Sequence, residues 1–252
     1  MSERALVFGT AAEAYDRHRL GYPDEVADLV LTYARGPVSQ ALEVGSGTGK
    51  ATVLLARRGL AVTACEPDPA MADVLRRRTA GLDVAVVTST FEALPTDRTY
   101  DLLWSASAWH WTDPATRWDR TALLVRPGGT VAFFGSTGTE LTDPGLEERI
   151  RVVRREVLAD EDLVVYQRSA SGTWWPGSEI EADDRFTDLE EHELARRVRR
   201  SRDEHVALLG TLSTYLRLPA DVRSGLLARI ADVLPDEVEA DADVRLHLAR
   251  RR

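Results

Sequence analysis

The 252-residue sequence has one cysteine, Cys65, and one lysine, Lys50. A single cysteine cannot form an intramolecular disulfide or a cysteine-rich zinc site, and it is compatible with a reducing cytosol. No window approaches about 18 consecutive apolar residues, and residues 1–5 lack the basic start and the apolar stretch of a signal peptide. We therefore expect a cytoplasmic protein without a membrane segment.

Histidines are few and scattered along the chain. They are His18, His110, His192, His205 and His247. No pair has the i, i+4 spacing of a helical metal site, and the sequence has no nucleophile elbow. We predict no metal and no serine nucleophile.

The composition is acidic and of ordinary hydrophobicity, with a formal net charge of −9 and 44% hydrophobic residues. An acidic surface repels nucleic acid phosphates and anionic membranes, so we expect neither as a partner. This length and hydrophobic content are sufficient for one large core. We expect a single domain over residues 1–252, as a monomer or a homodimer.

The most informative segment is residues 41–49, Ala-Leu-Glu-Val-Gly-Ser-Gly-Thr-Gly, which predicts a short strand followed by a glycine turn. Gly45, Gly47 and Gly49 leave room for a ligand close to the backbone, and a helix expected at residues 50–58 directs its N–H groups toward the same place. The G-x-G-x-G spacing differs from the G-x-G-x-x-G of dinucleotide sites, and Lys50 is not followed by the Ser or Thr of a phosphate-binding P-loop.

Four further apolar runs predict strands at residues 60–65, 84–87, 100–104 and 130–134. Glu66 ends the second strand, where a carboxylate can accept hydrogen bonds from both hydroxyls of a ribose. Pro67 then leads into an expected helix. Phe91 opens the sequence Phe-Glu-Ala-Leu-Pro after the third strand, and Arg126 begins Arg-Pro-Gly-Gly before the fifth.

This order of motifs resembles the class I S-adenosylmethionine-dependent methyltransferases of the small-molecule type, over roughly residues 10–136. The resemblance implies that S-adenosylmethionine is the cofactor and S-adenosylhomocysteine the product. It places Gly45, Ser46 and Gly47 beneath the methionine part, Glu66 on the ribose and Phe91 beside the adenine. Many relatives have Asp where Thr90 stands, so a hydroxyl or backbone contact to the adenine amine replaces a carboxylate here. The complete set of expected cofactor-binding residues is Tyr15, Arg19, Gly45, Ser46, Gly47, Glu66, Pro67, Thr90, Phe91 and Ser105.

The expected fold is α/β, a Rossmann-like doubly wound sheet of about seven strands, mostly parallel with a reversed last strand. We divide it into an N-terminal cap with the first helix (1–35), a cofactor-binding core (36–136), a helical insert or substrate cap (137–184), and C-terminal strands and helices that complete the sheet (185–252). Within these parts we expect helices at 144–159, 201–216 and 220–233, a sixth strand within 186–200, and a seventh at 244–249.

The N-terminal segment carries Tyr15 and Arg19 before a helix that starts near Pro23. In the resembling enzymes a Tyr-x-x-x-Arg stretch folds over the cofactor, so Tyr15 and Arg19 can close the site and meet the methionine carboxylate. The alternative is a tyrosine that holds an ordinary surface segment.

Residues 105–111, Ser-Ala-Ser-Ala-Trp-His-Trp, follow the fourth strand and should border both cofactor and substrate, because ligands of such sheets bind beyond the strands' carboxyl ends. His110 is a candidate general base or acceptor-orienting group, since histidine titrates nearest neutrality. Trp109 and Trp111 would wall the substrate pocket, unless the segment is structural. Trp174 and Trp175 form either a substrate lid or a hydrophobic contact that holds the insert against the core.

The sequence therefore predicts an enzyme that transfers a methyl group to the O, N or C atom of a small, apolar or aromatic acceptor by in-line displacement. The alternative is a protein that binds the same cofactor without methylating, as a cyclase, a rearrangement catalyst or a cofactor sensor.

Overall fold

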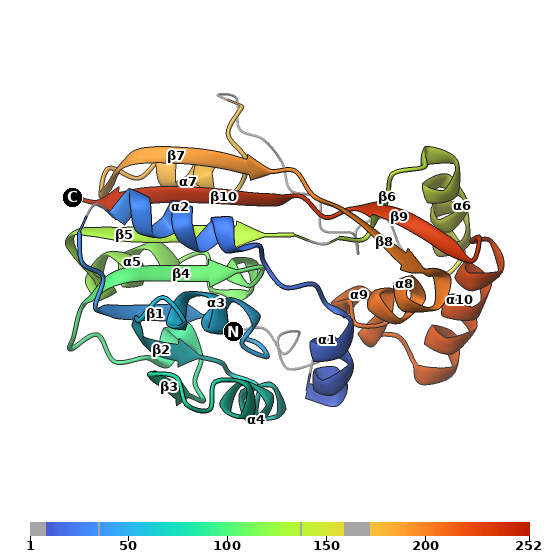
Figure 1. Cartoon of the computed structure of the whole chain (residues 1–252), viewed down its shortest axis with the longest axis horizontal. Helices are drawn as coiled ribbons and strands as arrows, with labels where there is room; N and C mark the ends of the chain where they lie inside the picture. Colours follow the sequence, from blue (N-terminus) through green and yellow to red (C-terminus); the bar gives the residue numbers. More distant parts are fainter. Residues whose placement is uncertain (1–8, 35, 137, 159–171) are drawn as a thin grey trace.

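The computed structural model describes residues 9–34, 36–136, 138–158 and 172–252 (Figure 1). Its main element is a seven-stranded sheet of order β3-β2-β1-β4-β5-β10-β7. These strands are β1 (Gln40–Val44), β2 (Ala61–Cys65), β3 (Val84–Val87), β4 (Tyr100–Ala106), β5 (Val125–Gly135), β7 (Phe186–Leu194) and β10 (Val244–Arg251).

The strands β1 to β5 are parallel, and β10 is antiparallel to both of its neighbours, β5 and β7. The predicted doubly wound sheet with a reversed last strand is therefore confirmed. Parallel strands bring the ends of β1, β2, β4 and β5 to one edge of the sheet. The glycine turn, Glu66 and the segment after β4 all lie at that edge.

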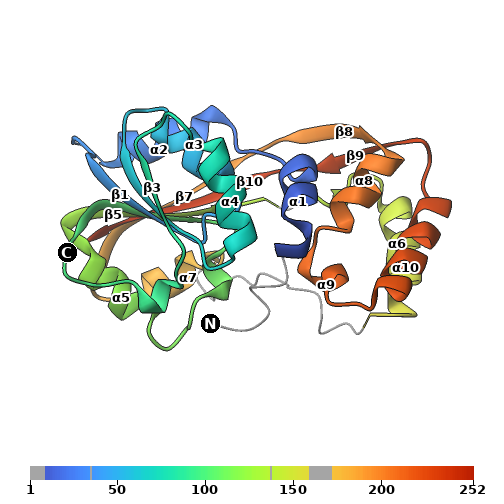
Figure 2. The same ribbon diagram turned by 90° about the horizontal axis from the view of Figure 1, so that it is seen from below.

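Helices cover both faces of the sheet, as Figure 2 shows in side view. One face packs against α2 (Asp24–Ala34), α3 (Lys50–Ala56) and α4 (Pro69–Arg78), and the other packs against α5 (Arg117–Leu124) and α7 (Gly177–Glu181). Neighbouring side chains of β4 point to opposite faces of the sheet and so contribute to the hydrophobic core on each face. Trp104 packs toward the first set of helices and Leu103 toward the second, and both are fully buried. Asp68 fixes the start of α4 by accepting hydrogen bonds from the Ala70 and Met71 N–H groups.

A second lobe continues from the ends of β5, β7 and β10 (Figure 1). Its three-stranded sheet has the order β6-β9-β8. The elements of this lobe are β6 (Glu140–Leu141), α6 (Pro144–Arg155), β8 (Arg197–Ser201), α8 (Arg202–Leu209), α9 (Ser213–Leu216), α10 (Ala220–Asp232) and β9 (Glu237–Asp241). Ile150, Leu209 and Ile230, from three different helices, are fully buried in its core.

The second lobe changes one sequence-based expectation. Of residues 185–252, only β7 and β10 join the main sheet, whereas β8, β9 and α8 to α10 pack with the helix α6 of the insert. The strand pattern of 186–200 is broken between Leu194 and Arg197, and Ser201 starts α8 with a capping box to Glu204. Part of the expected insert, residues 159–171, lies outside the described residues.

Helix α1 (Ala12–His18) lies between the two lobes in both views (Figures 1 and 2). Lys50 Nζ donates a hydrogen bond to the Asp16 carbonyl at 2.8 Å, which ties α1 to the glycine turn. Arg19 Nε donates to Thr211 Oγ1 at 2.9 Å, which ties the end of α1 to the second lobe. Within the described part of the chain, no helix is both long enough and apolar enough to cross a bilayer.

Candidate active site

A cavity of about 960 Å³ lies between the carboxyl ends of β1, β4 and β5, helix α1 and the second lobe. It brings together almost all of the residues that the sequence analysis singled out. The expected site residues that line it are Tyr15, Arg19, Gly45, Ser46, Gly47, Glu66, Pro67, Phe91, Ser105, Trp109, His110, Trp111, Trp174 and Trp175.

The glycine turn forms the floor of this cavity. Gly45 and Ser46 donate backbone hydrogen bonds to the Cys65 carbonyl at 2.9 and 3.0 Å, so the turn is fixed to the end of β2. Gly45 has φ +69°, and a Cβ there would lie 2.4 Å from the Ala108 Cβ. Gly47 has φ +56°, but a Cβ there would meet no atom within 4 Å. Packing therefore requires glycine at 45, whereas the space beside Gly47 is open to a ligand.

Glu66 stands beside this floor with its carboxylate held by the backbone. Its Oε2 accepts from the Gly47 N–H at 2.7 Å and its Oε1 from the Asp68 N–H at 2.9 Å. The side chain is buried, and burial raises the pKa of Glu66 to about 7. Each oxygen has a further lone pair, so a pair of ligand hydroxyls can donate to this carboxylate.

Glu43 is a second buried carboxylate in the cavity wall, and the sequence analysis did not select it. Thr52 Oγ1 donates to Glu43 Oε2, whereas Glu43 Oε1 has no hydrogen bond among the described residues. Burial raises the pKa of Glu43 to about 8. Its position as the acidic residue before the glycine turn was the available signal. A buried oxygen without a partner favours a ligand that brings a cation or a hydrogen-bond donor.

Tyr15 and Arg19 form the wall that α1 contributes. The Arg19 guanidinium lies 5.1 Å from the centre of the Tyr15 ring while it also binds Thr211. The Arg19 side chain therefore lines the cavity and connects the N-terminal cap to the second lobe. The sequence could not reveal its contact with Thr211, because residues 19 and 211 are far apart along the chain.

Phe91 and Thr90 differ in their relation to the cavity. Phe91 begins the short 3-10 helix η3 (Phe91–Ala93), is buried, and packs with its ring centre 5.6 Å from that of Trp109. The Thr90 hydroxyl accepts the Ala93 N–H at 3.2 Å and so caps η3. Thr90 is not among the residues that line the cavity.

The end of β4 and the segment after it supply the cavity wall beside the glycine turn. Ser105 Oγ donates to the Val44 carbonyl at 2.9 Å, which joins β4 to β1. The 3-10 helix η4 (Trp109–Trp111) then buries Trp109 against Phe133, with ring centres 4.5 Å apart. Trp109 thus has the buried position of the structural alternative while one edge lines the cavity.

His110 follows Trp109 and lies against Trp111, with ring centres 4.5 Å apart. Burial and then the nearby Arg117 charge lower the pKa of His110 to about 4. The imidazole is therefore neutral at pH 7, the form that can accept a proton or a hydrogen bond.

Trp174 and Trp175 reach the cavity from the insert. The Arg245 guanidinium lies 3.9 Å from the centre of the Trp174 ring, and the Trp174 N–H donates to Glu191 Oε2 at 3.0 Å. Trp175 Nε1 donates to Glu179 Oε1 at 3.0 Å. Both side chains thus line the cavity, and the Trp174 backbone and the Trp175 indole connect this segment to Glu191 and Glu179.

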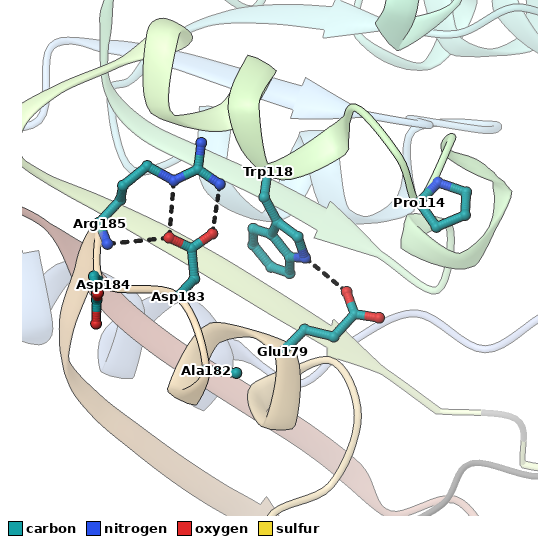
Figure 3. Close-up of a pocket in the computed structure, with 7 residues that line it drawn as sticks. All are labelled: Pro114, Trp118, Glu179, Ala182, Asp183, Asp184 and Arg185. Atoms are coloured by element: carbon teal, nitrogen blue, oxygen red, sulfur yellow. Dashed lines mark hydrogen bonds and ion pairs between the residues drawn. The ribbon is translucent and has the colours of Figure 1, made fainter.

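Glu179 also borders a shallow depression on the outer side of α5 and α7 (Figure 3). Its carboxylate accepts hydrogen bonds from Trp118 Nε1 at 2.6 Å and from Arg117 Nε at 3.1 Å. Asp183 and Arg185 form an ion pair at 2.6 Å on the same rim. These groups satisfy one another, so the depression has a structural role. In the described residues, no group of three or more His, Cys, Asp or Glu side chains is arranged to hold a metal ion.

Comparisons with known proteins agree with this geometry. A family model described as a methyltransferase domain matches residues 42–133. The chain is 32% identical over 236 residues to an uncharacterised methyltransferase of Mycobacterium tuberculosis, covering 92% of this chain and 87% of that protein. It is 33% identical over 132 residues to a malonyl-[acyl-carrier protein] O-methyltransferase of Salmonella typhimurium, about half of each chain (51% of both).

Solved structures show the same fold at low identity. The YcgJ protein of Bacillus subtilis superposes with a TM-score of 0.57 at 16% identity, over 90% of this chain and 98% of that one. A phosphoethanolamine N-methyltransferase of Haemonchus contortus, solved with phosphomonomethylethanolamine and S-adenosylhomocysteine, gives a TM-score of 0.55 at 16% identity, over 100% of this chain and 60% of that one.

Proposed function

Because the chain belongs to the class I S-adenosylmethionine-dependent methyltransferases, we propose that it transfers a methyl group from S-adenosylmethionine to an O, N or C atom of a small apolar or aromatic molecule. The observation that carries this proposal is the shared cavity. The glycine turn and Glu66 line it together with Trp111, Trp174 and Trp175.

The groups present suit S-adenosylmethionine as the bound cofactor. The two oxygens of Glu66 would accept hydrogen bonds from the ribose hydroxyls, and the open backbone at Gly47 would lie beneath the methionine part. Glu43 Oε1, which has no hydrogen-bond partner among the described residues, suits a ligand that brings a hydrogen-bond donor. Phe91 and Pro67 would border the adenine and Ser105 the methionine end, with Tyr15 and Arg19 closing the site.

When bound, the cofactor supplies a methyl group on a sulfonium, which is already activated toward attack. The protein's part is to align the acceptor, exclude water and, for a protic acceptor, remove a proton. Trp111, Trp174 and Trp175 provide apolar surface for the acceptor. His110 is the proposed proton acceptor, because its imidazole is neutral and lines the same cavity.

The acceptor atom is left open between O, N and C. The named relatives include an O-methyltransferase and an N-methyltransferase. In this proposal the identity of the acceptor depends on the second lobe. That lobe contributes larger side chains to the cavity lining than the glycine turn does, among them Arg154 and Tyr215.

Calorimetric titration with S-adenosylmethionine and S-adenosylhomocysteine tests the cofactor site. We expect Glu66→Ala to weaken binding by about 1–3 kcal/mol, because one charged acceptor of hydrogen bonds is lost. Glu237→Ala, at an exposed position in β9, is the matched control and should bind as wild type does. Absence of binding to the wild type would overturn the proposal.

An acceptor screen that measures released S-adenosylhomocysteine tests the reaction itself. Release that depends on an added acceptor supports methyl transfer. Tight cofactor binding with no release over a broad panel would instead favour the alternative, a cofactor sensor or a non-methylating catalyst.

A further inference from the structure

Ser107, directly after β4, has a strained backbone. Its φ is +54°, in the left-handed region that residues with a Cβ rarely adopt, and Asp188 is the other described non-glycine residue with a positive φ. The Ser107 N–H donates to the Phe134 carbonyl at 2.8 Å, which holds this conformation at the end of the β4–β5 pair. Glycine would adopt the same conformation without the steric cost.

The surrounding packing leaves space for the Ser107 side chain. Gly135 ends β5 opposite Ser107, and a Cβ at residue 135 would lie 2.9 Å from Ser107 Oγ. A larger residue at 135 would therefore displace the hydroxyl. A strained residue whose side chain is given its own space is typical of a functional position.

Tyr22 completes a pair with Ser107. Its phenolic oxygen lies 3.0 Å from Ser107 Oγ, and its ring packs edge-on against Phe134 with centres 4.9 Å apart. Both Tyr22 and Ser107 line the cavity. Among the described residues neither hydroxyl makes another hydrogen bond, so one hydroxyl hydrogen and several lone pairs are available to a ligand.

The pair stands at other strand ends than Gly47 and Glu66, although Ala108, the residue after Ser107, packs against Gly45. Gly47 and Glu66 stand at the ends of β1 and β2, whereas Ser107 and Phe134 stand at the ends of β4 and β5. Within the sheet order, β5 is further from β2 than β1 and β4 are. Ser107, after β4, is therefore one strand further from Glu66 than the glycine turn is, and we place the acceptor on this side of the cavity.

We propose that Tyr22 and Ser107 position the acceptor, by a hydrogen bond to the reacting hydroxyl or amine of a protic substrate. This inference rests on the proposed methyltransferase function and narrows its acceptor from O, N or C to a protic heteroatom. Burial raises the pKa of the Tyr22 phenol, so the pair stays protonated and orients the acceptor, while proton removal remains the role of His110.

Three variants distinguish the effect of losing the Ser107 hydroxyl from the effect of relieving the strain in the Ser107 backbone. Ser107→Gly removes both, Ser107→Ala removes only the hydroxyl, and Tyr22→Phe removes the partner. Asp188→Gly is the matched control, because it relieves the same kind of strain in β7, away from the cavity. For each protein we would measure Tm, S-adenosylhomocysteine affinity by calorimetry, and turnover with a panel of phenols, alcohols and amines.

We expect Ser107→Gly to raise Tm by about 2–4 °C while its kcat falls about 10- to 100-fold. The kcat of Ser107→Ala and of Tyr22→Phe should fall by a similar factor, but neither variant should gain Tm. Affinity for S-adenosylhomocysteine should stay within about twofold in all of them. Asp188→Gly should gain Tm and keep wild-type turnover.

Several results would overturn this assignment. Unchanged turnover in Ser107→Gly and Tyr22→Phe would remove the positioning role, and a parallel loss of S-adenosylhomocysteine affinity would make the pair a cofactor contact. Methylation restricted to carbon acceptors would also overturn it. So would a wild type that binds S-adenosylhomocysteine but, with S-adenosylmethionine as the methyl donor, methylates no phenol, alcohol or amine in the panel. A wild type that does not bind S-adenosylhomocysteine would instead overturn the proposed function.

Discussion

Trp175 Nε1 donates a hydrogen bond to Glu179 Oε1 at 3.0 Å, so a carboxylate of α7 holds an aromatic side chain of the cavity wall. The same carboxylate accepts hydrogen bonds from Arg117 of α5 and from Trp118 of α5, the latter drawn in Figure 3. Glu179 therefore joins Trp175, within the insert, to two residues of the core. Its hydrogen bonds with these partners lower the pKa of Glu179 against the opposing effect of burial, so it is ionised at neutral pH.

Glu179→Ala should lower the free energy of unfolding by about 2–4 kcal/mol, because the Arg117 side chain, only 6% exposed, would remain buried without its counterion. Urea denaturation measures this loss. The control is Glu148→Ala, whose ion pair with Arg151 is about half exposed on both sides and should contribute less than about 1 kcal/mol. Equal stability of the two variants would contradict the anchoring role.

Affinity for S-adenosylhomocysteine should rise with pH through about 7. The pKa of Glu66 is raised to about 7, so the carboxylate is protonated below that pH and ionised above it, and the ionised form is the stronger acceptor for ribose hydroxyls. Calorimetry from pH 6 to pH 8 should show the increase. Glu66→Gln should flatten it, whereas Glu43→Gln reports the separate contribution of Glu43, whose pKa is about 8. A wild-type affinity that is constant over this range would argue against Glu66 as the ribose ligand.

His110→Gln should lower kcat about 100-fold or more while S-adenosylhomocysteine affinity stays unchanged, if the imidazole accepts the acceptor's proton. Burial and the Arg117 charge lower the pKa of His110 to about 4. The pH profile of the wild-type rate should therefore show no change of slope near pH 6.5 from the titration of His110. Steady-state kinetics over pH 5 to pH 8 test both points. Unchanged turnover in His110→Gln would assign His110 a structural role.

The same lowered pKa makes His110 a source of acid sensitivity. The unfolded chain binds the proton at its ordinary pKa of 6.5 and the folded chain only near 4. The stabilising effect of neutral His110 is therefore complete above pH 6.5 and is lost as pH falls toward 4, by about 3 kcal/mol. His110→Gln should show a shallower loss in urea titrations over this range. His205, with its pKa also lowered to about 4, accounts for part of the remaining slope.

Two glycines of the floor should respond differently to alanine. Gly45→Ala should destabilise the fold by several kcal/mol, because its Cβ would overlap the Ala108 Cβ at 2.4 Å in addition to the cost of the left-handed backbone. Gly47→Ala meets no atom within 4 Å, so it should cost only about 1–2 kcal/mol of backbone strain while it blocks the cofactor. Thermal unfolding and calorimetry distinguish these cases, and wild-type cofactor affinity in Gly47→Ala would contradict a close approach there.

The turn and the carboxylate proposed to bind the cofactor could be placed at one edge of the sheet because their signals are local. Gly45, Gly47 and Glu66 are fixed by turns and by the carboxyl ends of parallel strands, and the order of those strands follows from apolar runs separated by helices. Glu43 was missed although it is the acidic residue before the glycine turn, because that position by itself does not reveal that the carboxylate is buried. The burial that leaves its Oε1 without a hydrogen bond exists only after β1, α3 and β4 have packed.

The second lobe could not be assembled from the sequence. Alternating residues in β8 and β9 are compatible with either sheet, and only the packing of Ile150, Leu209 and Ile230 assigns them to the smaller one. The contact between Glu179 and Arg117 was hidden because these residues meet across 62 residues of sequence.

The sequence by itself therefore determined the doubly wound sheet, its glycine turn and the acidic residue beside it, because periodicity and turn chemistry act over short stretches of chain. Tertiary structure alone decided which side chains face the same cavity and which of them are protonated. The contact of Arg19 with Thr211, the pairing of Tyr22 with Ser107 and the neutral imidazole of His110 all depend on packing between distant segments. Contact and burial between such segments are properties of the folded chain, and no local pattern encodes them.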